Sequence, residues 1–387
     1  MGEQEVAVRP TTTGELATVF LRLGVTAFGG PAAHIAIMED ELVRRRRWLT
    51  HERFLDLLGA ANLIPGPSST EMAIYIGYEQ AGLRGLVLAG TCFILPAALM
   101  VGVIAWAYVR FGRVPQIAGV LYGIKPIVIC VVAQALSNLA PKALKKSGLL
   151  ASVAAGACIA AALGVEPVVV LLGSGLMTVV ARRVLERPGS GGAASVLGPV
   201  ALGATGAAGA AAPVGLALLF LTFLKIGALV FGSGYVLLAF LRSELVERLH
   251  WLSEAELLDA VAVGQITPGP VFTTATFVGY LIAGAKGAAV ATVGIFLPGF
   301  VLVAVTRPFI ARARRSPTAG AFLDGVNVAS LALMAVVTVE LARGALVDIP
   351  AILLAVAGVV LLVRWKVNST WLVAGAALVG ALTHAPR

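Results

Sequence analysis

The fold is decided by two stretches of the chain that repeat one another. Residues 20–67 read FLRLGVTAFGGPAAHIAIMEDELVRRRRWLTHERFLDLLGAANLIPGP, and residues 223–270 read FLKIGALVFGSGYVLLAFLRSELVERLHWLSEAELLDAVAVGQITPGP. The two align without a gap and keep Trp48 level with Trp251 and one Pro-Gly-Pro level with the other. Chance similarity of Leu- and Ala-rich helices does not place such rare residues in register. We therefore predict two homologous halves, 1–187 and 213–387, joined by a Gly/Ala/Pro-rich stretch over 188–212.

The composition indicates a membrane protein. The chain has 387 residues, of which 59% are hydrophobic and 13% charged, and its mean hydropathy is +0.94. Soluble domains are about 45–50% apolar and about 25% charged, so a soluble enzyme, a disordered protein and a disulfide scaffold are excluded. The short alternating segments of a membrane β-barrel are absent from the sequence. The predicted class is an all-α polytopic membrane protein.

Charge and reactive residues give no sign of an enzyme or of a nucleic-acid partner. The net charge of +9 fits basic loops retained on the cytoplasmic side of a membrane. The polar N-terminus lacks the apolar segment of a cleavable signal peptide. The histidines and cysteines have no metal-site spacing, and no paired Asp, Ser/His or metal cluster falls within the apolar runs. We expect no cofactor, no metal and no catalytic residue.

Basic loops indicate that the two halves have opposite orientations. The loop that follows the first apolar segment of the first half is strongly basic, whereas the equivalent loop of the second half holds few cations. In the next equivalent pair of loops, the loop of the second half is the more basic one. Because Lys and Arg concentrate in cytoplasmic loops, the halves are predicted to form an inverted-topology repeat, as in secondary transporters. The loops compared hold Arg44–Arg47 and Arg53 against Arg242 and Arg248, then Arg110 and Arg113 against Arg307, Arg312, Arg314 and Arg315.

The number of crossings depends on the interrupted segments. Segments 16–38 and 54–82, with their partners 219–241 and 257–283, contain Gly-Gly-Pro, Gly-Ser-Gly or Pro-Gly-Pro. If these segments are re-entrant, the chain has about nine crossings, and if they cross fully it has about thirteen. Uninterrupted spans are predicted at 85–108, 116–139, 148–164 and 167–181, at 287–306, 320–342, 350–363 and 370–384, and, between the halves, at 197–212.

The helix breaks are the predicted functional site. Proline and glycine end a helix, and broken backbone is tolerated within lipid only where it lines a cavity or is buried in protein. A helix that restarts there presents unpaired N–H groups and the positive end of its dipole, which together favour an anion. We predict an anion site near the midplane, built from Gly29, Gly30, Pro31, Pro65, Gly66, Pro67, Gly232, Ser233, Pro268, Gly269 and Pro270.

Side chains near these breaks are the candidate ligands. Arg22 and Lys225 occupy equivalent positions within apolar runs, so we predict a pair of cations that face the anion; the alternative is that they snorkel to an interface. Amide donors Asn62 and Gln265, and hydroxyls Ser68, Ser69 and Thr273, are further candidates.

Two residues are candidates for carrying a coupling proton. Glu71 closes the sequence Ser68-Ser-Thr-Glu71, which is also the pattern of a helix capping box, so capping is its alternative role. His34 lies near the first glycine break and titrates near neutral pH when its environment is unperturbed. A structural role is its alternative.

The motifs resemble those of the chromate ion transporter family, in its long two-domain form. The likeness spans residues 15–385 and includes F-G-G-P, R-x-W-L, P-G-P, Y-I-G-Y and L-P in the first half, with Q-x-T-P-G-P and F-L-P-G in the second. The family often has Gln at the position of Asn62, where this chain has a shorter amide. The resemblance implies a multi-pass transporter of a prokaryotic inner membrane that exports chromate by alternating access and confers chromate resistance. The alternatives are a porter for sulfate or another oxyanion, and an anion channel. A homodimer is compatible with the sequence, which does not fix the oligomeric state.

Overall fold

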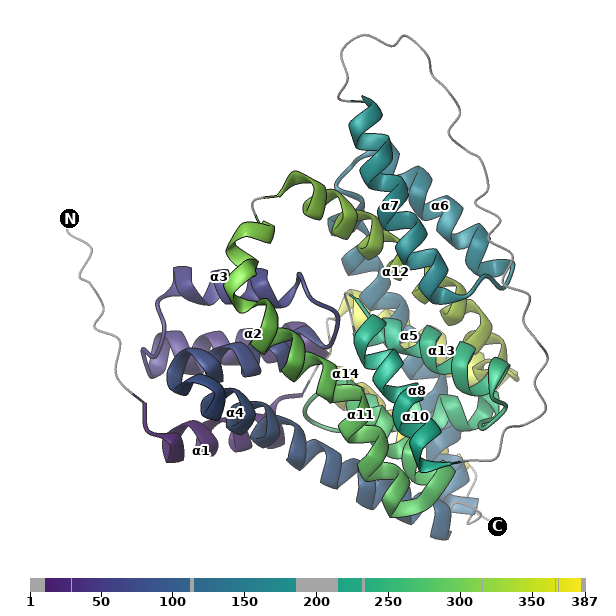
Figure 1. The fold of residues 1–387 in the computed structure, drawn as a ribbon. Helices are drawn as coiled ribbons and strands as arrows, with labels where there is room; N and C mark the ends of the chain where they lie inside the picture. The colour runs from purple at the N-terminus through teal and green to yellow at the C-terminus, as the bar shows by residue number, and fades with distance from the viewer. Residues whose placement is uncertain are drawn as a thin grey trace.

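The computed structural model is helical throughout the part of the chain that it describes (Figure 1). It describes residues 11–28, 30–111, 115–185, 215–231, 234–314, 316–365, 367 and 369–383, and it has no strand among them. The prediction of an all-α fold is therefore confirmed. The predicted linker 188–212, the span predicted within it at 197–212, and Gly29, Gly232 and Ser233 lie outside the described residues.

Each half begins with two helical hairpins. In the first hairpin of the first half, Arg22 on the outgoing arm pairs with Glu41 on the returning arm; in the second, Arg53 pairs with Glu79. The arms of the first half are α1 (Thr13–Thr26), α2 (Gly30–Glu39) with the π-helical turn η1 (Asp40–Arg45), α3 (His51–Ala61) and the start of α4. Those of the second half are α8 (Leu216–Leu229), η2 (Gly234–Val236), α9 (Leu237–Leu241), η3 (Arg242–Arg248), α10 (Glu254–Ile266), η4 (Val271–Thr273) and the start of α11.

The longest helices fold back on themselves. In α4 (Ser68–Phe111) the helical dihedrals fail at Ala81 and Gly82, where Gly82 has φ +59°. Gly77 and Gly85 then touch across the bend, since a Cβ added at Gly77 would lie 2.3 Å from the Gly85 carbonyl oxygen. We call residues 68–81 the short arm of α4 and residues 83–111 its long arm. In α11 (Thr274–Arg314) the same bend at 283–284 separates a short arm, 274–283, from a long arm, 285–314.

The uninterrupted spans predicted within the two halves coincide with helices of the described residues; the span predicted at 197–212 lies outside them. The described part of the chain holds five helical segments that are long and apolar enough to cross a membrane, and α4 and α11 contribute two of these. The others belong to α5 (Pro115–Leu144), α7 (Pro167–Leu185) and α12 (Pro317–Ala345). Shorter apolar helices complete the set: α6 (Gly148–Ala162), α8, α13 (Ile349–Arg364) and α14 (Ser369–Thr383).

Equivalent helices of the two halves run antiparallel. Along the long arm of α4, Gly90 lies against Phe300 of α11, while Gly102 lies near Thr276, whose hydroxyl contacts that of Thr292. As one helix advances, its contacts on the other therefore move backwards. Two equivalent helices related in this way require a two-fold axis perpendicular to them. If they cross a bilayer, that axis lies in the membrane plane, as the predicted inverted repeat requires.

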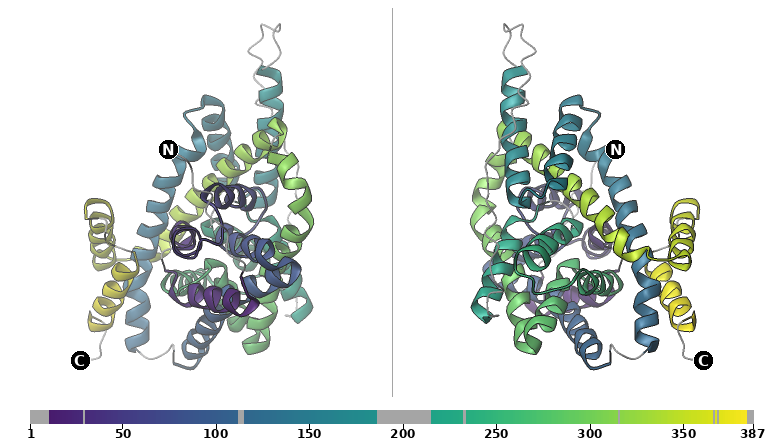
Figure 2. Two further views of the ribbon diagram at one scale, coloured as in Figure 1. Left: turned by 90° about the vertical axis from the view of Figure 1, so that its left-hand side faces the viewer. Right: turned by 90° about the vertical axis from the view of Figure 1, so that its right-hand side faces the viewer.

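The halves are also interlocked through their last helices. The α6–α7 pair of the first half packs on α12 of the second, and α13–α14 pack on α5 of the first (Figures 1 and 2). Close contacts occur at equivalent glycines: a Cβ at Gly325 would lie 2.4 Å from the Ser174 carbonyl oxygen, and one at Gly123 would lie 2.1 Å from that of Ala376. Neither half packs fully without the other.

Basic segments that are distant in sequence meet at one end of α12. Lys145, between α5 and α6, and Arg182, near the end of α7, both pair with Asp324 of α12, at 2.6 and 2.7 Å. Arg183 donates to the Thr318 hydroxyl at the start of the same helix. The fold thus brings basic side chains from two separate segments of the first half to the start of α12 in the second.

Candidate anion site

The hairpin tips of the two halves meet and bond to one another. The N–H of Gly66, in the first Pro-Gly-Pro, donates to the carbonyl oxygen of Val230 at 2.7 Å. The N–H of Gly269, in the second, donates to the carbonyl oxygen of Ala27 at 2.9 Å. Ala27 and Val230 are equivalent residues at the C-terminal ends of α1 and α8. Each Pro-Gly-Pro turn therefore closes against the first hairpin of the opposite half.

Glycine is required where these tips meet. Gly66 and Gly269 have φ of +130° and +87°, conformations that side chains with a Cβ rarely adopt. A Cβ at Gly269 would also lie 2.6 Å from the Cβ of Ala97 and 3.2 Å from the carbonyl oxygen of Gly24. The second Pro-Gly-Pro is thus inserted between α1 and the long arm of α4. The tips are closely packed in this conformation.

Helices restart at the tips, and polar groups there lack partners. α2 begins at Gly30 and α4 at Ser68, and the first N–H groups of an α-helix have no partner within the helix. In the second half the short turn η4 comes before α11. The Thr70 hydroxyl and the Gln265 side-chain nitrogen are buried, and neither has a hydrogen-bond partner among the described residues. Gln265 was predicted as a donor, but Thr70 was missed. Its alignment with Thr273 in the repeat was a signal that could have found it.

Glu71 lies beside the first Pro-Gly-Pro. Its side chain is fully buried, and neither carboxylate oxygen has a hydrogen-bond partner among the described residues. A Cβ added at Gly66 would lie 2.0 Å from Oε1, and one at Gly299 would lie 4.0 Å from it, so the carboxyl group sits between the turn and α11. The alternative role of Glu71 in a helix capping box is not adopted, because neither carboxylate oxygen has a hydrogen-bond partner among the described residues. Its role as a proton carrier stays a prediction.

His34 and Ser69 are brought together at the first half's tips. The His34 side chain is buried, and its Nδ1 lies 3.3 Å from the Ser69 hydroxyl. Its ring meets that of Phe93 edge-on, with 5.8 Å between centroids. The contact joins the start of α2 to the start of α4, so the two restarting helices of this half lie side by side.

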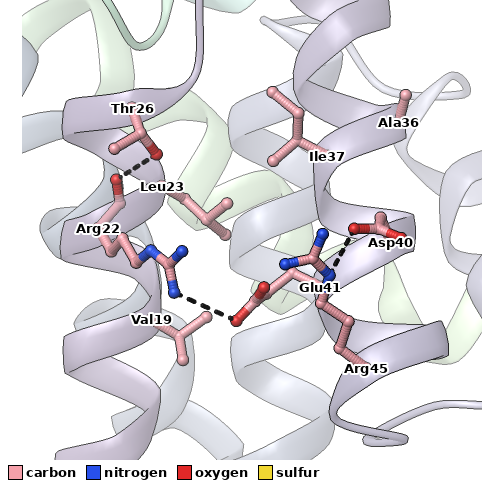
Figure 3. A pocket seen from close by; sticks show the side chains of 9 residues that line it. All are labelled: Val19, Arg22, Leu23, Thr26, Ala36, Ile37, Asp40, Glu41 and Arg45. Carbon is pink, nitrogen blue, oxygen red and sulfur yellow. Dashed lines mark hydrogen bonds and ion pairs between the residues drawn. The ribbon is translucent and has the colours of Figure 1, made fainter.

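Arg22 and Lys225 lie on the hairpin arms, away from the tips. Arg22 is 63% exposed, and its Nη1 is 3.9 Å from the Glu41 carboxylate (Figure 3). Lys225 pairs with the equivalent Glu244 at 2.6 Å and with Glu166 at 2.9 Å. In both halves the cation thus closes its own hairpin. Their role as anion ligands stays a prediction.

A cavity of about 390 Å³ opens between the arms of the first hairpin and contains Arg22. Asp40 and Glu41 line it together with Arg45, and Arg45 pairs with Asp40 at 2.7 Å (Figure 3). Beside it, a hydrogen bond from Arg46 to Glu41 raises the pKa of the Arg46 guanidinium, so Glu41 is shared between two cations. Cations and carboxylates balance in this cavity, which gives it no preference for an anion.

The remaining predicted residues differ in exposure between the halves. Asn62 ends α3 and is exposed, whereas the equivalent Gln265 is half-buried. Pro65 and Ser68 are half-buried. At the second tip, by contrast, all three residues of the Pro-Gly-Pro are buried. The Thr273 hydroxyl there donates to the Pro270 carbonyl oxygen at 2.8 Å. Pro31 reaches across to the other half, 3.9 Å from a Cβ placed on Gly234, and Pro67 is buried.

A second charged cluster links the halves. Lys125 of α5 pairs with Asp259 of α10 at 2.9 Å, and the Tyr108 hydroxyl donates to the same carboxylate at 2.8 Å. Asp259 belongs to the hairpin that carries the second Pro-Gly-Pro, whereas its two partners belong to the first half. This cluster therefore ties one tip-bearing hairpin to spans of the opposite half.

Comparison with known proteins agrees with this architecture. The family model described as chromate transporter matches the chain twice, over residues 14–179 and 217–381. The chain belongs to the chromate transporter family. The resemblance predicted from the motifs is thereby confirmed, and so is the repeat. Members of this family are transporters, as predicted, and not enzymes.

Relatives of full length are found in several bacteria. A chromate transport protein of Cupriavidus metallidurans is 36% identical, covering 98% of this chain and 95% of its own length. A probable chromate transport protein of Synechococcus elongatus is 33% identical, covering 92% and 90%. A chromate transport protein of Pseudomonas aeruginosa is 32% identical, covering 98% and 94%. No solved structure matches the chain.

Proposed function

We propose that this protein exports chromate across a prokaryotic inner membrane by alternating access, and so confers chromate resistance. The observation that carries the proposal is the reciprocal closure of the tips, Gly66 on Val230 and Gly269 on Ala27. The names of three relatives that cover nearly the whole chain supply the substrate.

The chemistry at the tips suits a tetrahedral oxyanion. Restarting helices offer backbone N–H groups and positive dipole ends. The buried donors Thr70 and Gln265 come from opposite halves and have no partner among the described residues. Each is a buried donor to which an oxyanion held between the tips would offer an acceptor. Because the tips are packed together in this conformation, binding requires that the hairpins of the two halves separate.

The direction follows from charge. In a cell that is negative inside, expelling a dianion is favoured by about 4.6 kcal/mol per 100 mV, at about 2.3 per charge. The face that gathers Lys145, Arg182 and Arg183 is the proposed cytoplasmic side. An anion enters the tips from that side and leaves on the other.

Uptake of labelled chromate into inside-out vesicles tests the proposal. We expect accumulation driven by a potential that is positive inside, and strong loss of uptake in Gln265→Leu and Thr70→Val, which remove the two unpartnered donors. Gly173→Ala is the matched control, because nothing lies within 4 Å of the added Cβ. Absence of uptake above empty vesicles would overturn the function, and normal uptake by both donor variants would overturn the site.

Two further outcomes identify the alternatives. Equal inhibition by sulfate and by unlabelled chromate would indicate a general oxyanion porter. Single-channel currents in planar bilayers would indicate a channel instead of alternating access. Selective inhibition by chromate with no unitary currents is the result expected of the proposed exporter.

A further inference from the structure

The two halves differ chemically at the tips, and the difference is a carboxyl group. Glu71 follows the first Pro-Gly-Pro, and Thr274 occupies the equivalent place after the second. The Thr274 hydroxyl donates to the Val271 carbonyl at 2.8 Å and is satisfied. Glu71 is fully buried, and its two oxygens have no hydrogen-bond partner among the described residues. Repeat symmetry therefore does not explain Glu71.

The position of the carboxyl group connects it to the anion site. Oε1 is so close to Gly66 that a Cβ there would lie 2.0 Å from it, and the Gly66 N–H is the group that closes the tip on Val230. A bare carboxylate at this place repels an anion at the tips, and low surrounding polarity strengthens that repulsion. A protonated carboxyl has no charge and offers an O–H donor.

We propose that Glu71 is the proton-binding site that is linked to anion binding. This inference rests on the proposed transport of an oxyanion. When the anion enters, the Glu71 carboxylate takes up one proton, and its O–H donates to an anion oxygen. When the tips separate and the anion leaves, the carboxyl group is exposed to water and releases the proton to it. This coupling is reciprocal: the bound proton raises the affinity for the anion, and the bound anion raises the affinity for the proton, by the same factor.

The linkage has a consequence for charge movement. A dianion that travels alone carries two negative charges, whereas a dianion and one proton together carry one. The wild-type protein therefore moves one net negative charge for each anion, so the membrane potential still favours export but drives it half as strongly as it would drive a dianion that travels alone. A protein that has lost the Glu71 carboxyl moves two.

Other titratable groups lie near Glu71, and the experiment needs variants that distinguish them from it. His34 of α2 contacts Ser69, two residues before Glu71. Tyr75 lies one turn further along the short arm of α4, and its hydroxyl is 3.4 Å from that of Thr306 on α11. α11 itself brings Gly299 against Glu71, and the opposite tip brings Val230 against Gly66. His34 is the rival proton acceptor, since Tyr75 is neutral at physiological pH.

The experiment uses purified full-length protein in liposomes, at pH values above the one at which chromate itself takes up a proton. Above the pH at which the carboxyl group of ligand-free Glu71 loses its proton, the chromate affinity of the wild type is expected to fall about tenfold per pH unit. The chromate affinity of Glu71→Gln is expected to be independent of pH. Charge per anion, from electrogenic current and labelled flux, is expected to rise from one to two in Glu71→Gln. Glu79→Gln, on the same short arm but paired with Arg53, is the matched control and should behave as wild type.

A measurement that does not depend on transport distinguishes loss of the proton site from misfolding of the variant. Infrared difference spectra on addition of chromate should show the C=O band of a protonated carboxyl in the wild type and in Glu79→Gln, and no such band in Glu71→Gln or Glu71→Thr. A band that persists in both Glu71 variants overturns the proposal. So does a pH dependence that survives Glu71→Gln and disappears in His34→Gln. If the wild type transports no chromate, the proposed function fails; if it transports with unchanged coupling in Glu71→Gln, only the proton site fails.

Discussion

Gly269→Ala tests the closure of the tips most directly. The substitution forces alanine into a left-handed conformation at φ +87°, which costs about 1–2 kcal/mol. Its Cβ would lie 2.6 Å from that of Ala97, where contact normally begins near 3.5 Å, and such overpacking costs about 1–3 kcal/mol. Displacing the turn also weakens the bond to Ala27, which contributes about 1 kcal/mol. The total is roughly 3–6 kcal/mol, a large fraction of the stability of a typical domain.

Two further variants separate these contributions. Gly284→Ala also places alanine at positive φ, +62°, but nothing lies within 4 Å of its Cβ, so only the backbone cost of about 1–2 kcal/mol applies. Ala97→Gly costs about 1 kcal/mol in helix propensity by itself. Combined with Gly269→Ala it removes the clash, so the double variant should be more stable than the sum of the single changes by about 1–3 kcal/mol.

Thermal unfolding in detergent and chromate flux in proteoliposomes provide the measurements. We expect Gly269→Ala to melt well below Gly284→Ala and to lose most of its flux, with partial recovery on adding Ala97→Gly. If Gly269→Ala matches Gly284→Ala in both measurements, or if Ala97→Gly brings no recovery, the second Pro-Gly-Pro does not pack against α1 and α4 as described.

Three more predictions concern the charged and interlocked parts of the fold. Lys225→Ala should lower stability by roughly 1–3 kcal/mol because it removes a partner from the buried Glu244. Arg22→Ala should cost under about 1 kcal/mol, because the Arg22–Glu41 pair is longer and Arg22 is exposed. Equal shifts of the melting temperature in the two variants would contradict this. Asp259→Ala should cost about 3–5 kcal/mol because Lys125 loses its carboxylate, and adding Lys125→Ala should recover part of it, as a double-mutant cycle of unfolding would show. Gly325→Leu should abolish the monodisperse peak in size-exclusion chromatography, because even a Cβ there lies 2.4 Å from a backbone oxygen of α7; an unchanged peak would refute the interlocked packing.

Much of the fold could be predicted because the repeat and the helix breakers act locally. Proline and glycine end helices wherever they occur, so the positions of the tips at Pro-Gly-Pro followed from sequence. The repeat then implied that the tips come in equivalent pairs. The reciprocal bonds of Gly66 and Gly269 are the three-dimensional result of that symmetry.

The pairing of charges could not be predicted as readily, because it depends on which arms lie together. Glu41 and Glu244 were aligned in the repeat, but their contact with Arg22 and Lys225 appears only when each hairpin closes. The partner of Lys125 lies on a hairpin of the other half, far along the chain. Glu71 matched a capping pattern, and only the packing of the Gly66 turn against α11 showed that its carboxyl group points elsewhere.

The exchange of α6–α7 and α13–α14 between the halves constrains how the protein is made. During synthesis α6 and α7 leave the ribosome well before α12, the helix on which they pack, has been translated. Until α12 has been inserted, α6 and α7 lie in the bilayer without the helix on which they pack. In the same way, α5 lacks its packing partners until α13 and α14 have been synthesised. Separately produced halves should therefore assemble only when co-expressed, and a ribosome that stalls before α12 should leave a fragment open to degradation.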